Sequence, residues 1–434
     1  MKCKLMLSHL LVRALFLALA TTAMASNSWY VDGVNGNDNN NCKTPETACK
    51  TIRHAISLSS RGDFIRIAAA TYTENVSIPF ALDIIGSDAS TTIIDGGSGG
   101  SVFWIPPFAR VVLSNVTVRH GAAQNYGGGI FVENKGTLTV NNSIISDNTV
   151  GVWGRGGGGG VFVAANAMLT INNSTVIGNS AHSHLGSSGG GILNNGGTVT
   201  INKSIITGNQ ANFFGGGICT FGTLTVNNST VSGNGDGGIY NSGTLTVVKS
   251  TMSGNTTSGA GSGITNYGIL TITNSTISGN LASYGAGLAL YSGKTTISNS
   301  TLHGNSASSG GGVAQSGSAT ITLQNSIVAD NSGGNCYGSV TSSGYNLSSD
   351  NTCNFNSTGD MNNTDPKLGT LGDYGGPTQT IPLLAGSPAI DAGNPNGCTD
   401  ANGDLLKTDQ RGYPRPDKED TGGCDMGSYE RQKD

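Results

Sequence analysis

One short pattern recurs eight times between residues 127 and 331. Each copy has a glycine-rich step that ends in an apolar residue, an alternating segment, a serine, a second short apolar segment and an asparagine. The serine always stands five residues before the asparagine, in the pairs Ser143/Asn148, Ser174/Asn179, Ser204/Asn209, Ser229/Asn234, Ser250/Asn255, Ser275/Asn280, Ser300/Asn305 and Ser326/Asn331. A period of 21 to 31 residues is typical of units that bury their apolar face only by stacking on the next copy.

The residues around each serine predict strands rather than helices. Leu224 and Val226, before Ser229, show the usual arrangement, in which the fifth and third residues before the serine are apolar and a threonine separates them. Val231 shows that another apolar residue follows two positions after the serine. This period-two alternation indicates short β-strands. Three such strands in each copy predict an all-β fold, with each copy forming one coil of a parallel β-helix.

Glycine and asparagine fit the corners that such a coil needs. The chain has 68 glycines in 434 residues, and glycine and asparagine accept the positive φ angles of tight corners. Equivalent residues of successive coils lie roughly 4.8 Å apart. We therefore expect the asparagine column to form a ladder of side-chain hydrogen bonds along the axis. Lys203 and Lys249 replace asparagine just before the serine, and we expect both to point into solvent.

The first 25 residues have the features of a secretory signal peptide. Basic residues precede an apolar run, and Ala23-Met-Ala25 is a small-x-small cleavage site. The formal net charge is −4, and removal of Lys2, Lys4 and Arg13 with this segment makes it −7, which argues against a nucleic-acid partner. No later segment is apolar enough for a transmembrane helix. We expect a secreted or cell-surface protein.

Two regions flank the repeats. Residues 26–126 are expected to form an N-terminal cap and irregular first coils, with a short amphipathic helix over 49–56 and strands over 64–67, 82–85, 91–94 and 111–118. Residues 332–434 form a C-terminal region rich in Gly, Pro and Asp. Neighbouring cysteines in an exported chain predict three disulfides that close loops at the two ends and leave Cys219 free; the predicted pairs are Cys42/Cys49, Cys336/Cys353 and Cys398/Cys424.

Several motifs resemble those of known bacterial proteins. The N-terminal segments 29–32, 49–52 and 71–75, followed by the repeats, resemble exported right-handed parallel β-helix proteins of pectate-lyase-like architecture. The C-terminal region is similar to the choice-of-anchor Q domain, in the motifs Gly344-Tyr-Asn-Leu347, Thr364-Asp-Pro-Lys-Leu-Gly369, Gly375-Gly-Pro-Thr378, Gly386-Ser-Pro-Ala-Ile-Asp-Ala-Gly393, Asp409-Gln-Arg-Gly412 and Cys424-Asp-Met-Gly-Ser-Tyr-Glu430. The resemblance implies a right-handed, exported or surface-associated β-helix. It does not imply a particular reaction, because this architecture carries lyases, hydrolases and adhesins.

Charged residues are too sparse in the repeats to indicate catalysis. A lyase or hydrolase needs clustered charge, whereas the carboxylates of residues 127–331 are Glu133, Asp147, Asp236 and Asp330, on separate coils. The sequence therefore identifies no catalytic residue. It favours a non-catalytic adhesion or glycan-binding module whose partner is a polysaccharide or a host or cell-surface component. A polysaccharide lyase or glycoside hydrolase and a structural surface spacer are the alternatives.

Two groups of residues are candidates for binding. The position after each Gly-step apolar residue forms a column that alternation turns outward if Ile130 and its equivalents point inward; its members are Phe131, Phe162, Leu193, Cys219, Tyr240, Thr265, Ala289 and Ala314. Large apolar side chains in water often mark an interaction surface, so Phe131, Phe162, Leu193 and Tyr240 are candidate binding residues. A column that is covered, or that belongs to the core, is the alternative.

The second group is a loop rich in oxygen ligands. Asp32 and Asp38, with Asn35 and Asn37 between them, are candidate ligands for calcium, the one cofactor that the sequence suggests. The same residue types are ordinary turn formers, so a structural turn is the alternative.

Overall fold

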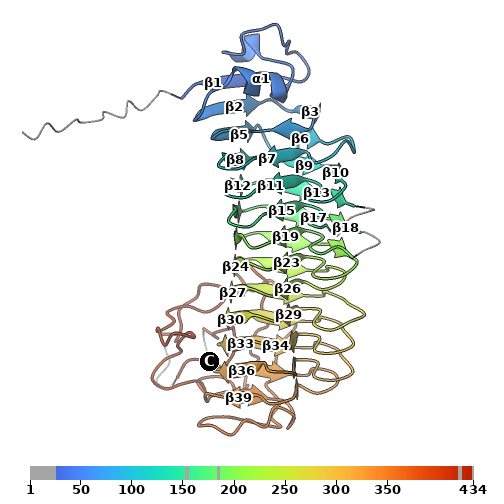
Figure 1. Ribbon diagram of the computed structural model, residues 1–434. Helices are drawn as coiled ribbons and strands as arrows, with labels where there is room; N and C mark the ends of the chain where they lie inside the picture. Colours follow the sequence, from blue (N-terminus) through green and yellow to red (C-terminus); the bar gives the residue numbers. More distant parts are fainter. Residues whose placement is uncertain (1–25, 152–155, 183–185, 419–422, 433–434) are drawn as a thin grey trace, which may run out of the picture.

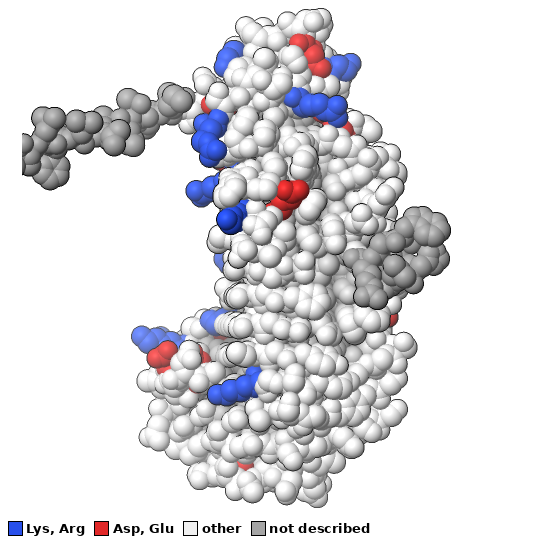
Figure 2. Space-filling model, viewed as in Figure 1, with Lys and Arg blue, Asp and Glu red and all other residues white. Residues whose placement is uncertain are grey.

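The computed structural model describes residues 26–151, 156–182, 186–418 and 423–432. Stacked coils form a straight rod, and the C-terminal region lies beside its last coils (Figure 1). Charged side chains gather at the N-terminal end and on the C-terminal region, whereas few lie on the middle coils of the face shown in Figure 2. The predicted signal peptide, residues 1–25, falls outside the described residues.

Three long parallel sheets run along the rod. Sheet A has 13 strands, which are β1 (Ser28–Val31), β2 (Asp63–Ile67), β5 (Leu82–Gly86), β8 (Arg110–Ser114), β12 (Thr137–Asn141), β16 (Met168–Asn172), β20 (Thr198–Asn202), β24 (Thr223–Asn227), β27 (Thr244–Val248), β30 (Ile269–Thr273), β33 (Lys294–Ser298), β36 (Thr320–Gln324) and β39 (Thr341–Ser342). Sheet B has 12 strands, which are β3 (Ala70–Thr73), β6 (Thr92–Asp95), β9 (Thr117–Arg119), β13 (Ile144–Ser146), β17 (Thr175–Ile177), β21 (Ile205–Thr207), β25 (Thr230–Ser232), β28 (Thr251–Ser253), β31 (Thr276–Ser278), β34 (Thr301–His303), β37 (Ile327–Ala329) and β40 (Leu347–Ser348).

Sheet C has 11 strands, which are β4 (Val76–Ser77), β7 (Phe103–Ile105), β11 (Ile130–Val132), β15 (Val161–Val163), β19 (Ile192–Asn194), β23 (Ile218–Thr220), β26 (Ile239–Asn241), β29 (Ile264–Asn266), β32 (Leu288–Leu290), β35 (Val313–Gln315) and β38 (Cys336–Tyr337). A fourth, four-stranded sheet D follows the asparagine corner in part of the rod, with β10 (Ala122–Ala123), β14 (Thr149–Val150), β18 (Ser180–Ala181) and β22 (Gln210–Ala211). The predicted all-β, parallel β-helix is confirmed.

The irregular first coils and the last coil extend the same stack. The expected strand over 111–118 is two strands, β8 and β9, because Asn115 takes a φ of 57° and turns the chain from sheet A to sheet B. Strands β38, β39 and β40 add one more coil after Asn331, and the Cys336–Cys353 disulfide joins this coil to the loop that follows it.

A single apolar core fills the rod. In each coil the alternating residues point inward, as Ile218, Leu224, Val226 and Val231 do with no exposed surface. The residue before each serine adopts a left-handed φ of 46–52°, which asparagine tolerates better than most residues. This corner sends the chain from sheet A into sheet B in every copy.

The predicted asparagine ladder is continuous from Asn148 to Asn335. Each Nδ2 donates to the Oδ1 of the ladder residue in the next coil, at 2.8–3.0 Å. The same Oδ1 also accepts from the preceding backbone N–H, as Asn255 Oδ1 does from Asn234 N at 3.1 Å. Serine hydroxyls accept in a parallel column, from Ser143 N to Ser174 Oγ at 3.0 Å onward. These side chains satisfy buried corner amides that have no backbone partner.

A short helix closes the N-terminal end of the rod. The expected N-terminal helix is α1 (Ile52–Leu58), which buries Ile52, Ala55 and Ile56. Its first backbone amides donate to the Glu74 carboxylate at 2.8 and 3.0 Å, which stabilises the positive end of the helix. The three predicted disulfides are confirmed, and Cys219 is buried and unbridged among the described residues.

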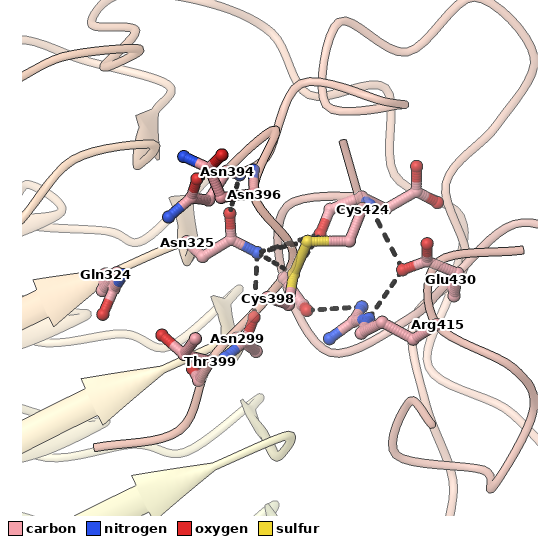
Figure 3. Close-up of a disulfide and its surroundings, with 12 residues drawn as sticks. Asn299, Gln324, Asn325, Asn394, Asn396, Cys398, Thr399, Arg415, Cys424 and Glu430 are labelled. Atoms are coloured by element: carbon pink, nitrogen blue, oxygen red, sulfur yellow. Dashed lines mark hydrogen bonds and ion pairs between the residues drawn. A yellow bond between two sulfur atoms is a disulfide. The ribbon is translucent and has the colours of Figure 1, made fainter. Parts of the chain in front are cut away.

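The C-terminal region folds back onto four successive corners of the rod. Asn325 Nδ2 lies against the Cys398–Cys424 disulfide and donates to Asp425 O at 3.1 Å (Figure 3). One coil earlier, Asn299 Nδ2 donates to Thr399 O at 2.7 Å. Lys249 Nζ donates to Thr408 Oγ1 at 2.6 Å. The expectation that Lys249 points into solvent is therefore wrong, and its burial lowers the pKa of its ammonium group.

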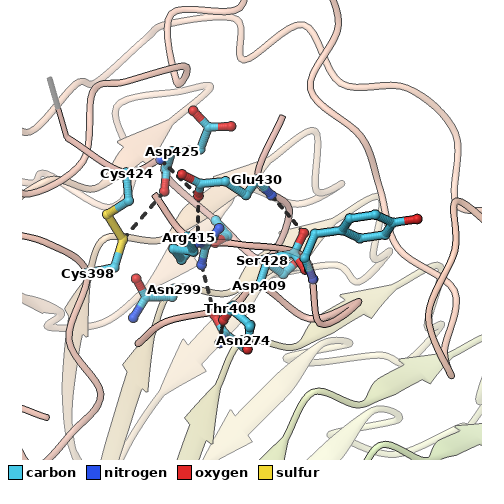
Figure 4. Close-up of polar contacts among 12 residues, drawn as sticks. Asn274, Asn299, Cys398, Thr408, Asp409, Arg415, Cys424, Asp425, Ser428 and Glu430 are labelled. Carbon is cyan, nitrogen blue, oxygen red and sulfur yellow. Dashed lines mark hydrogen bonds and ion pairs between the residues drawn. A yellow bond between two sulfur atoms is a disulfide. The ribbon is translucent and has the colours of Figure 1, made fainter. Parts of the chain in front are cut away.

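A buried ionic network holds this docked region together. Arg415 forms an ion pair with Glu430 at 2.6 Å and donates to Asn274 Oδ1 of the rod at 2.8 Å (Figure 4). Burial raises the pKa of the Glu430 carboxyl group, and the adjacent Arg415 guanidinium opposes that shift. Asp409 pairs with Arg411 at 2.7 Å and accepts from the backbone amides that follow it. These buried acidic and basic side chains thus hold the C-terminal region together and attach it to the rod.

We expect Asn255→Ala to lower the free energy of unfolding by roughly 3 kcal/mol. The change removes the acceptor of Asn234 N–H and the donor that reaches Val231 O at 3.0 Å, both in the buried ladder. The measurement is urea denaturation followed by circular dichroism. Thr256→Ala, at the next and exposed position, is the control and should change stability by less than about 0.5 kcal/mol. If Asn255→Ala were as stable as Thr256→Ala, the asparagine ladder would not stabilise the fold.

Candidate functional site

The outward face of sheet C carries a column of large side chains. The register places Phe131, Phe162 and Leu193 side by side on successive coils, and they point away from the core formed by the residues on either side of them. The column begins earlier than the repeats, because Trp104 on β7 pairs with Phe131. It ends at Tyr337 on β38. Sequence reasoning missed both residues because they lie outside the eight copies.

The middle of this column is covered rather than exposed. Phe162 and Leu193 are only 4% and 7% exposed, and Cys219 is fully buried. They form a small cluster of their own, onto which Phe214 packs from a loop. These side chains point outward, as alternation predicts. The expectation that they are exposed to solvent is wrong for Phe162, Leu193 and Cys219, and the alternative of a covered column is correct for them. Burial also raises the pKa of the Cys219 thiol to about 12.

Loop aromatics continue the column into a wider surface. Tyr126 lies 4.4 Å from Phe162 between ring centroids, and Phe214 stacks on Tyr240 at 4.3 Å. Tyr267 stacks on Tyr291 at 4.8 Å. We name this surface the sheet C strip; its members are Trp104, Tyr126, Phe131, Phe162, Phe213, Phe214, Phe221, Tyr240, Tyr267, Tyr284, Tyr291 and Tyr337.

Exposed rings of the strip border three hollows. The first, about 400 Å³, is lined by Trp104, Phe131 and Glu133 with Asn75. The second, about 420 Å³, is lined by Tyr126, Phe162, Leu193, Phe213, Phe214, Phe221 and Asn195. The third, about 160 Å³, is lined by Phe213, Asp236, Tyr240, Thr265, Tyr267 and Tyr291. Apolar walls with a few polar groups are the usual make-up of a small-ligand site.

Two carboxylates lie on the strip. Trp104 Nε1 donates to Glu133 Oε1 at 3.0 Å, which fixes the indole ring while 44% of Trp104 stays exposed. Asp236 lines the third hollow, and burial raises the pKa of its carboxyl group, an effect that His182 partly offsets. No Lys or Arg is among the described residues that line the three hollows.

The two candidate calcium ligands use their carboxylates in turns. Asp32 Oδ1 accepts from the amides of Val34 and Asn35 at 2.8 and 3.0 Å. Asp38 Oδ1 accepts from the amides of Lys50 and Thr51, and its Oδ2 accepts from the Thr51 hydroxyl at 2.9 Å. The Asp32 bonds close a turn within the loop, and the Asp38 bonds tie the loop to the start of α1. This is the arrangement expected of a structural turn.

Metal-ligating atoms from three residues converge at one place among the described residues. The atoms belong to Cys42, Cys49 and His54 and lie within 4.8 Å of one another. Both cysteines are joined in a disulfide, so their sulfur atoms are not thiolates and are poor metal ligands.

An acid–base cluster lies at another corner of the rod, after sheet B. Asp95 Oδ2 accepts from Arg119 Nε at 3.0 Å and contacts His120 Nδ1 at 2.8 Å. Asp147 of the next coil lines the same hollow of about 390 Å³ as Asp95 and His120. Burial alone would raise the pKa of Asp95, but hydrogen bonds from Gly97, Arg119 and His120 bring it below its usual value. Sequence reasoning missed this cluster because it considered the carboxylates of residues 127–331 alone, and Asp95 and His120 precede the eight copies.

The comparisons with known proteins concern the fold. Residues 84–257 match the family model of the right-handed β-helix region. The structure described as the complex of XylC with xylose has a TM-score of 0.53 and 9% identity, covering 93% of this chain and 98% of that chain. Pectate lyase Pel9A has a TM-score of 0.45 and 16% identity, covering 94% and 96%. The GH136 lacto-N-biosidase from Eubacterium ramulus has a TM-score of 0.36 and 11% identity, covering 74% and 64%.

The family match and the likeness to XylC show a right-handed parallel β-helix protein. At 9% identity the likeness to XylC is one of fold alone. The search of curated proteins gives no match. None of the helices among the described residues has the length and apolarity that a membrane crossing requires.

We expect Phe162→Ser to lower the free energy of unfolding by roughly 3 kcal/mol, because it removes a buried ring and leaves a cavity beside Leu193 and Cys219. Phe213→Ser is the matched control. Phe213 is 60% exposed, so its loss should cost less than about 1 kcal/mol. Thermal and urea denaturation of the two variants provide the comparison. If Phe162→Ser were as stable as the original protein, the packing of Phe162 under the loop would contribute nothing to the free energy of unfolding.

Proposed function

We propose that this protein is exported, associates with a surface, and binds glycans through the sheet C strip without chemical conversion. The observation that carries this proposal is the row of exposed aromatic rings beside the three hollows. Aromatic rings stack on the C–H faces of pyranose sugars, and tyrosine hydroxyls and asparagine amides bond to sugar hydroxyls. The three disulfides support an extracellular location, as does the resemblance of residues 1–25 to a signal peptide.

The exposed rings, not the covered ones, are the residues to test. We expect Phe213→Ser with Tyr267→Ser to weaken binding to polysaccharides at least tenfold while the melting temperature stays within a few degrees, because both side chains are at least 40% exposed. The measurement is affinity electrophoresis of the full mature chain in gels that contain β-glucan, xylan, chitin fragments or mannan.

Tyr413→Ser is the control for this double variant. Tyr413 is 42% exposed, close to the 40% of Tyr267, but lies in the C-terminal region away from sheet C. Its loss should leave glycan binding unchanged. Retained binding by the double variant, or an original protein that no polysaccharide retards, would reject the proposal.

A carbohydrate-active enzyme is the second candidate, and the acid–base cluster is the observation that favours it. The Asp95 carboxylate holds the His120 ring through Nδ1, so Nε2 is available to take a proton from a bound hydroxyl group or water. Asp147 adds a second carboxylate to the same hollow. A polysaccharide lyase or a glycoside hydrolase needs groups of these types.

We expect His120→Asn to lower any release of reducing ends or unsaturated products at least a hundredfold if this cluster is catalytic. Asp365→Asn, which changes an exposed carboxylate of the C-terminal region, is the control and should leave the rate unchanged. The assay is product release from the same polysaccharides by the purified mature chain. Activity that survives His120→Asn would show that this cluster is not the catalytic site.

A further inference from the structure

The three hollows of the sheet C strip lie in one line along the rod. The first borders β4, β7 and β11, the second borders β15 and β19, and the third borders β26 and β29. These strands follow one another in sheet C, with β23 between the second hollow and the third. Aromatic rings separate them. Tyr126 and Phe131, whose centroids are 6.1 Å apart, stand between the first and the second. Phe213 and Phe214 line both the second and the third.

The length of this line follows from the coil spacing. Six steps along sheet C separate β7, which carries Trp104, from β29, which precedes Tyr267. At one strand spacing per step the line is ~29 Å long. One pyranose unit of an extended glycan is about as long as one coil is thick, so about six units would span the line. A shorter ligand would leave at least one hollow empty.

The charge of the strip restricts the chemistry of the ligand. The Glu133 carboxylate lies at the first hollow and the Asp236 carboxylate at the third. A uronic-acid chain would bring a carboxylate on every unit toward these two groups, and like charges at short range repel. Uncharged sugar units meet no such cost.

We infer that the strip recognises an extended, uncharged polysaccharide that lies parallel to the rod axis and fills the three hollows with about six pyranose units. This inference rests on the proposed glycan binding and adds to it the ligand's length, charge and direction. Trp104 holds one end of the chain, fixed by its bond to Glu133. Tyr267, stacked on Tyr291, holds the other end.

The test uses the full mature chain and β-1,4-glucose oligomers of two to six units, titrated by calorimetry. Affinity should rise with each added unit and differ at least tenfold between the dimer and the hexamer. Cellouronate hexamers, which have the same linkage with a carboxylate on each unit, should bind at least tenfold more weakly than the neutral hexamer. The variant Glu133→Gln with Asp236→Asn should reduce this difference at least threefold.

Variants at the two ends test the direction of the chain. In Trp104→Ala the hexamer should bind no more tightly than the tetramer, because one terminal hollow has lost its ring. Tyr267→Ala should have the same effect from the other end, and Tyr413→Ser should have none. Melting temperatures near that of the original protein verify that substitutions at these exposed positions leave the fold intact.

The outcomes separate this inference from the proposed function. Neutral oligomers whose affinity levels off at two or three units, or cellouronates that bind as tightly as neutral chains, would overturn the inference and leave glycan binding in place. Binding of these oligomers that neither end variant alters would place the ligand elsewhere on the rod. If neither oligomers nor any of the polysaccharides bind, both the inference and the proposed function fail.

Discussion

Asparagine side chains make the hydrogen bonds that the backbone cannot make at one corner of each repeated coil. There the chain leaves sheet B, and its buried amide N–H has no strand to pair with. Asn255 Oδ1 accepts from that amide and from the Asn234 side chain, while its own Nδ2 reaches Val231 O. Each asparagine therefore joins two coils at a fixed register. The alignment of the residues on sheet C, and so the strip itself, depends on that register.

The fold could be predicted because its information is periodic. Alternation around each serine identifies the strands, and the constant spacing from Ser229 to Asn234 and its equivalents identifies the ladder. Alternation also gives the outward direction of Phe162 correctly. It could not show that Phe214 covers this column, because Phe214 lies in a loop whose length differs from coil to coil. The repeat pattern does not extend to such a loop and so does not indicate where it packs.

The candidate sites were harder to predict for the same reason. Trp104, Asp95 and His120 lie in first coils whose sequence departs from the repeat, so they cannot be aligned with Phe131 or Asp147 by pattern alone. The docking of the C-terminal region on Lys249 joins residues 159 positions apart. Such long-range polar contacts follow from the complete packing of the chain and not from a local motif.

The variable loops have a consequence for how this rod can change. From each ladder asparagine to the next Gly-step apolar residue the chain takes 13 residues after Asn148 but only five after Asn234. Nearly all the difference in coil length is taken up there, beside the sheet C strip, and the ladder bonds on either side keep the same lengths. Insertions at this edge can therefore remodel the surface while the scaffold stays constant, much as hypervariable loops diversify on an antibody framework.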